Sequence, residues 1–163
     1  MSHSPKRVAE LCPKAAELVD RSVLRAGARV TINAGHEAIW ALLTDPDGWS
    51  DWYGGVKDSK GTAPLKIGSK ISFKAGPTVF RGRVDELVKH HTLRFSGKSQ
   101  GSSATYLFRL EAKGKRTQVL AAVNMGGMVI RATRPVMQAV AERAVLRWLD
   151  ALENAVPAAT TKK

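Results

Sequence analysis

The sequence lacks several features that would narrow its function at once. It has a single cysteine, Cys12, so no disulfide can form within the chain, and its Cys and His residues do not have the spacing of a structural zinc site. No apolar run approaches the roughly 20 residues of a membrane-spanning helix, and the first residues lack the apolar core of a secretory signal. These absences predict a cytoplasmic protein with no metal site and no cofactor.

Acidic residues are scarce. The chain has 14 Asp and Glu against 26 Lys and Arg, a formal net charge of +12 that would attract anionic partners. The basic residues are dispersed, and pairs such as Arg81 and Arg83 alternate along predicted strands, which places each pair on one strand face. No aromatic residues are interleaved with them as in nucleic-acid-binding modules. We therefore expect a solvated basic sheet face that could contact an acidic protein or an anionic membrane surface, and we do not expect nucleic acid as a partner.

Length and composition indicate one globular domain. The chain has 163 residues, of which 44% are hydrophobic and 25% are charged, and this is enough for one substantial core. We expect an N-terminal extension at residues 1–21, either a short helix or a mobile segment. The domain should occupy residues 22–156, and a disordered tail should follow at residues 157–163.

The last long segment, from Arg134 to Val156, has the pattern of an amphipathic helix. Its apolar residues recur at steps of three and four, while charged residues occupy the other side. Pro135 fits the first turn, where its missing N–H costs no hydrogen bond, and Pro157 is expected to end the helix. The apolar stripe consists of Met137, Ala141, Ala144, Val145, Trp148, Leu149 and Leu152.

Patterns of period two earlier in the chain predict a sheet. A first strand at residues 23–32 precedes a helix at residues 36–44 and a short second helix around residues 49–53. Six further strands are predicted at residues 56–60, 70–75, 78–88, 92–98, 103–112 and 117–125. A change of parity near Asp85 predicts a bulge. Because the links between these strands are too short for crossover helices, we expect antiparallel pairing.

This order of elements and several motifs resemble the SRPBCC superfamily, the START-like group that includes polyketide cyclases and dehydratases. The motifs are HEAIWALLTDPDGWSDWYGGV, LKIGSKISF, GRVDELVKHHTLRFSG, YLFRLEAKGKRTQVLAAVNMGG and LRWLDALENAV, and the likeness spans Val23 to Val156. The resemblance implies an α+β helix-grip fold. In such a fold a seven-stranded antiparallel sheet wraps around a long C-terminal helix, and two short helices follow the first strand.

The resemblance also implies a cavity between the sheet and the C-terminal helix. Small residues on the helix, Ala141 and Ala144, would leave room there unless bulkier neighbours fill it, as close packing normally requires. The predicted ligand-binding residues are Trp49, Trp52, Tyr53, Phe73, Phe80, Phe95, Tyr106, Phe108, Met125, Met128, Met137, Ala141, Ala144 and Trp148. Such a lining is almost entirely apolar.

Few polar side chains are available in that interior for catalysis. Tyr106 has the best-placed inward hydroxyl, although a core tyrosine can also serve only to anchor its hydroxyl. Five other polar residues would reach the interior only if the local register turned them inward, namely Glu86, Arg94, Arg109, Asn124 and Thr133. No nucleophile with a partnered base stands out, so we assign no catalytic residue.

Three functions remain compatible with these observations. The first is binding of an apolar small molecule, such as a lipid, a quinone or a polyketide-like compound, by a carrier or sensor. The second is an enzyme of the polyketide cyclase/dehydratase type that uses the same cavity. The third is a protein-interaction module that uses the basic outer face.

Overall fold

The first strand, β1 (Leu24–Ile32), has the predicted alternation, with Leu24 buried and Arg25 and Arg29 exposed. The computed structural model describes residues 24–160. Our expectations for residues 1–21, Cys12 included, lie outside the described part of the chain.

Two short helices follow β1, as predicted. α3 (His36–Leu43) buries Ile39, Trp40 and Leu43, and a 3₁₀ turn, η1 (Pro46–Gly48), leads into α4 (Trp49–Trp52). The indole N–H of Trp49 donates to the backbone oxygen of Leu43 at 3.1 Å, which fastens α4 to the end of α3.

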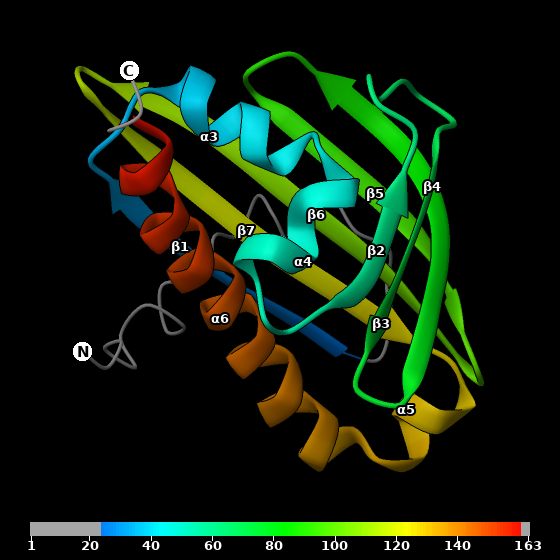
Figure 1. The fold of residues 1–163 in the computed structure, drawn as a ribbon. Helices are drawn as coiled ribbons and strands as arrows, with labels where there is room; N and C mark the ends of the chain where they lie inside the picture. The colour runs from blue at the N-terminus through cyan, green and yellow to red at the C-terminus, as the bar shows by residue number, and fades with distance from the viewer. Residues whose placement is uncertain (1–23, 161–163) are drawn as a thin grey trace.

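The remaining strands form one antiparallel sheet with the order β1-β7-β6-β5-β4-β3-β2 (Figure 1). Their bounds are β2 (Lys57–Gly61), β3 (Lys70–Ala75), β4 (Thr78–Val88), β5 (Thr92–Ser99), β6 (Ser102–Lys113) and β7 (Arg116–Gly126). The bulge predicted near Asp85 is present, because the register of β4 against β5 shifts between Val84 and Glu86.

The two edge strands differ from the central ones. In β2 the pairing with β3 is irregular between Lys57 and Lys60, and Asp58 has a φ of 52°. At the other edge, the side-chain amide of Gln138 donates to the backbone oxygen of Arg25 in β1 at 2.9 Å. Both edges therefore differ from a regular, open strand: β2 has an irregular register, and β1 has a backbone oxygen bonded by a side chain.

The long C-terminal helix, α6 (Arg134–Thr160), begins where predicted but does not end at Pro157. That part of the prediction was wrong. Leu152 and Val156 are buried, so packing holds the preceding turn helical, and a proline can continue it with the loss of one hydrogen bond. Among residues 24–160, no helix has the length and apolar character needed to cross a membrane.

A short helix that the sequence did not predict, α5 (Met128–Ala132), lies between β7 and α6. Gly127, with a φ of 102°, turns the chain out of β7 in a conformation that side chains rarely adopt. Of the residues in α5, Ile130 is buried. α5 lies at one end of the sheet, next to the start of α6 (Figure 1). α3 lies near the C-terminal end of α6, and α4 lies near its middle.

The main core lies between the sheet and α6, and the helix-grip α+β fold is confirmed. All the inward-facing aromatic residues of the strands belong to this core. The opposite face of the sheet has a small second cluster, formed by Leu107, Leu120 and Ala122. Strand alternation thus divides the sheet into an inner face toward α6 and an outer face.

Candidate functional site between the sheet and α6

Trp148 of α6 is the centre of an aromatic cluster. Its ring centroid lies 4.2 Å from that of Tyr53, 5.3 Å from Trp49 and 5.4 Å from Phe108. Trp52 lies 5.9 Å away. The Trp148 contacts with Trp49 and Trp52 are edge-to-face, a favoured geometry that contributes beyond the area buried. α4 is therefore held against the middle of α6 by aromatic rings.

A second aromatic group lines the inner faces of β3, β4, β5 and β6. Phe73 stacks on Phe80 at 4.9 Å, and Phe95 stacks on Tyr106 at 5.0 Å. Phe95 also lies 5.4 Å from Trp49, which joins the two groups. The interior is a continuous aromatic surface built from six elements, namely α4, β3, β4, β5, β6 and α6.

The space left in this interior is small. A void of about 20 Å³ lies between the sheet and α6, enough for a single water molecule at most. It is lined by Tyr106, Phe108, Ala121, Ala122, Val123, Met125, Ala144, Val145 and Trp148. Side chains therefore nearly fill the cavity that the resemblance implied.

Most of the predicted ligand-binding residues come together here. Those in the buried core are Trp49, Tyr53, Phe73, Phe80, Phe95, Phe108, Ala141 and Trp148, and those partly buried at its margin are Trp52, Tyr106, Met125, Met137 and Ala144. Met128 is the exception, because it is 83% exposed at the start of α5. Gly127 turns the chain there, so Ile130 points inward in its place.

The hydroxyls of Tyr53 and Tyr106 belong to the aromatic interior. Burial raises the pKa of Tyr106, and the nearby Tyr53 raises it further. Burial also raises the pKa of Tyr53, while the positive charge of Arg147, 5.9 Å from the ring centroid, lowers it in part. Both groups are neutral at pH 7, so they can donate a proton in a hydrogen bond but cannot act as bases.

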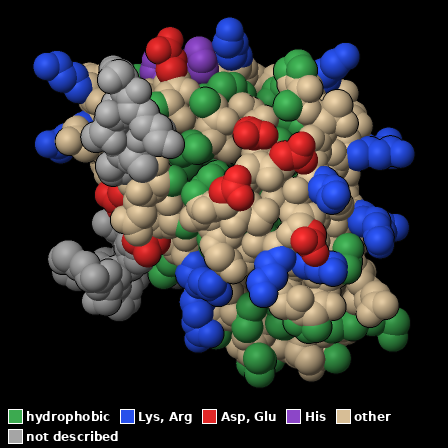
Figure 2. Space-filling view, viewed as in Figure 1, with side chains coloured by type: hydrophobic (Ala, Val, Ile, Leu, Met, Phe, Trp, Pro, Cys, Tyr) green, Lys and Arg blue, Asp and Glu red, His purple; other side chains and the backbone are tan. Residues whose placement is uncertain are grey.

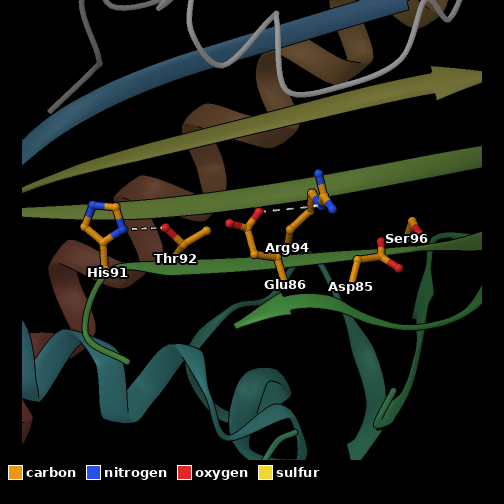
Figure 3. Close-up of polar contacts among 6 residues, drawn as sticks. All are labelled: Asp85, Glu86, His91, Thr92, Arg94 and Ser96. Carbon is orange, nitrogen blue, oxygen red and sulfur yellow. Dashed lines mark hydrogen bonds and ion pairs between the residues drawn. The ribbon is translucent and has the colours of Figure 1, made fainter. Parts of the chain in front are cut away.

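The polar candidates on the strands lie on the outer face, and these are Glu86, Arg94, Arg109 and Asn124. Thr133 is exposed between α5 and α6. Glu86 pairs across the strands with Arg94 at 4.0 Å (Figure 3). Arg109 lies opposite Leu120 of the outer cluster. His91 and Ser96 also bond outside the core, to Thr92 and Asp85 respectively. Residues 24–160 contain no group of three or more acidic, His or Cys side chains that could hold a metal ion.

A much wider hollow lies on the outer face, away from this core. It has a volume of about 830 Å³ and spans β2 to β5. Its basic residues are Lys60, Lys70, Arg81, Arg83 and Lys98. Its one acidic residue, Asp47, accepts a hydrogen bond from the backbone N–H of Gly61. These basic side chains give the hollow a positive charge.

Comparison with known proteins agrees with the architecture. Residues 24–157 match the profile of a family described as polyketide cyclase/dehydrase and lipid transport. No curated protein matches the chain.

Several solved structures share the fold at low sequence identity. The Zhui aromatase/cyclase from Streptomyces sp. R1128 is 14% identical, with a TM-score of 0.71 over 82% of this chain and 93% of that one. A START superfamily protein from Mycobacterium smegmatis is 13% identical, with a TM-score of 0.71 over 82% and 97%. A hypothetical protein from Helicobacter pylori is 15% identical, with a TM-score of 0.72 over 96% and 99%.

Proposed function

The chain belongs to the polyketide cyclase/dehydrase and lipid transport family, and from this premise we propose that it binds an apolar small molecule between the sheet and α6. The proposed ligand is a lipid, a quinone or a polyketide-like compound. The protein would act as a carrier or a sensor for it. The apolar aromatic lining described above supports this class of ligand.

The observation that carries the proposal is the position of the remaining void along α6. In the C-terminal half of the helix, Leu149 and Leu152 are buried against the sheet. In the first two turns, Val136 and Val140 are exposed and Met137 is only partly buried. Ala144, which lines the void, lies where the firmly packed half begins. The void lies beside Ala144, Val145 and Trp148, at the start of the firmly packed half and just beyond the part of the helix that packing holds least.

Binding in this site requires the first half of α6 to move. α5 precedes it, and Gly127 gives the chain a turn of unusual backbone geometry before α5. A displacement of this segment would enlarge the space beside Met125 and Ala144 without disturbing the aromatic contacts of Trp148. The ligand would gain affinity from buried apolar area, at roughly 25 cal/mol per Å², and selectivity would be broad.

A cyclase-type activity is the second candidate, favoured by the two tyrosine hydroxyls at the same interior. Both hydroxyls keep their protons at pH 7, so each could donate a hydrogen bond to developing negative charge on a substrate oxygen. Catalysis of this kind would depend on Tyr106, whereas binding alone would survive its replacement by phenylalanine.

The first test is titration with an environment-sensitive apolar dye, followed by displacement with a fatty acid, a quinone and an aromatic polyketide. Ala144→Leu places three extra carbons against the void, so we expect the affinity for the dye to fall about tenfold, equivalent to about 1.4 kcal/mol.

Ala139→Leu is the matched control, because Ala139 is exposed on the same helix and the same carbons are added to solvent. Circular dichroism would check that both variants are folded. Absence of dye binding by the wild type, or equal affinities of the two variants, would contradict the proposal. Turnover of a polyketide substrate that is lost in Tyr106→Phe would favour the enzyme.

A further inference from the structure

The end of the molecule formed by α5 and the first two turns of α6 exposes large apolar side chains. Met128 is 83% exposed and Val136 66%, while Val129 and Val140 are 48% and 40% exposed. Soluble proteins seldom expose large apolar side chains in a contiguous patch without a partner. We call Met128, Val129, Val136 and Val140 the apolar tip.

The charged residues of the segment that carries the apolar tip are arginines. The sequence from Gly126 to Ala141 contains Arg131 and Arg134 and no acidic residue, and both arginines are exposed. Beyond the tip, Arg143 and Arg147 follow Val136 and Val140 at steps of three and four residues, so they lie on the same face of α6. One helix face thus passes from apolar residues to arginines within about two turns.

The apolar tip is held in place by backbone contacts. The N–H of Val129 donates to the oxygen of Gly101 in the turn between β5 and β6 at 3.2 Å, and the Arg131 N–H donates to Gly127 at 3.0 Å. The Thr133 hydroxyl donates to Val129 at 2.7 Å. With Ile130 buried beneath it, α5 presents its apolar side chains outward at a fixed position.

Figure 2 shows the same arrangement over the surface. Hydrophobic side chains gather at the lower end of the molecule, where Figure 1 places α5 and the start of α6, and Lys and Arg side chains lie beside them.

We propose that the apolar tip docks on an anionic lipid bilayer. Its Met and Val side chains would enter the boundary between headgroups and acyl chains, and the arginines around it would pair with lipid phosphates, as in interfacial amphipathic helices. The tip combines exposed aliphatic side chains with flanking arginines and has no acidic residue between Gly126 and Ala141, and this combination suits an anionic lipid surface. Docking there would bring the movable half of α6 to the membrane, so that an apolar ligand could enter directly. This last step rests on the proposed function.

The test uses the full chain and ligand-free vesicles of phosphatidylcholine, with or without phosphatidylglycerol, in a co-sedimentation assay. We expect binding to the anionic vesicles and about tenfold weaker binding by the double variant Met128→Gln/Val136→Gln. The control is Val88→Gln, which removes an exposed valine of β4 outside the apolar tip and should bind as the wild type does. Arg131→Gln/Arg134→Gln should reduce the preference for anionic vesicles and the sensitivity to salt.

Three outcomes would overturn the proposal. The first is no binding to either vesicle. The second is binding that salt abolishes but the Met128→Gln/Val136→Gln variant leaves unchanged, which would assign it to the basic hollow on the outer face. The third is a dimer in solution that this variant converts to a monomer, which would make a second copy the occupant of the tip. Because the vesicles are ligand-free, none of these outcomes depends on whether the interior binds a ligand.

Discussion

The two tyrosines of the chain both lie in the aromatic interior, and their protonation links this interior to stability in alkaline solution. Because burial raises the pKa of Tyr106 above its ordinary value of 10.0, the folded state keeps the proton at a pH at which the unfolded chain has lost it. The stabilising contribution is therefore complete below pH 10 and is lost progressively as the pH rises further.

We expect the free energy of unfolding of the wild type to fall above pH 10, with Tyr106 contributing about 1.4 kcal/mol per pH unit. Tyr106→Phe should remove that part of the slope, as measured by urea unfolding at a series of pH values. Tyr53→Phe should have a smaller effect, since Arg147 offsets part of the shift at Tyr53. An unchanged alkaline slope in Tyr106→Phe would show that its hydroxyl is solvated.

At the scale of the element, α6 combines a firmly packed half and an exposed half. Leu152→Ala should lower the free energy of unfolding by about 2–5 kcal/mol, because it empties a fully buried site. Val136→Ala should change it by no more than about 0.5 kcal/mol, because its side chain is mostly in water. Shifts in the urea midpoint would measure both.

Hydrogen exchange gives an independent check on the same element. Amides in the first two turns of α6 should exchange faster than those from Val145 onward, since local opening requires only partly buried contacts to break there. Uniform protection along the helix would argue against an opening at its first half, and so against entry of a ligand by that route.

Most elements that the sequence predicted correctly have a long periodic pattern, and the four-residue α4 is an exception. β1 and α6 show their periods over nine residues or more, and the parity change at Asp85 revealed the bulge. α5 was missed because five residues between Gly127 and Thr133 are too few to display a helical period. Met128 was assigned to the interior because the orientation of its side chain depends on the turn at Gly127, which the sequence pattern does not reveal.

At the scale of the whole molecule, the sequence indicated which residues face the interior but not how much space they leave. Alternation along strands and the stripe on α6 determine the direction of each side chain. The size of the void depends on how rings such as Trp49 and Trp148 pack against each other, and this involves residues far apart in the chain. The direction of a side chain can therefore be predicted from the local pattern, whereas the volume of the void depends on tertiary packing.

The irregular edges of the sheet bear on how copies of the protein behave at high concentration. An open edge with regular backbone geometry is a template for another strand, and proteins avoid this with charges, bulges or side chains that cover the edge. β2 has Lys57 and Lys60 and an irregular register, and Gln138 occupies a backbone oxygen of β1. Lys57→Val/Lys60→Val should therefore self-associate, with light scattering that rises with protein concentration.

Lys113→Val/Lys115→Val removes the same charge at the hairpin turn between β6 and β7, away from both edges, and should remain dispersed. Equal scattering from the two variants would mean that net charge alone keeps the copies apart. With the edges as they are, we expect the wild type to stay dispersed at concentrations at which an open, regular edge would recruit strands from other copies.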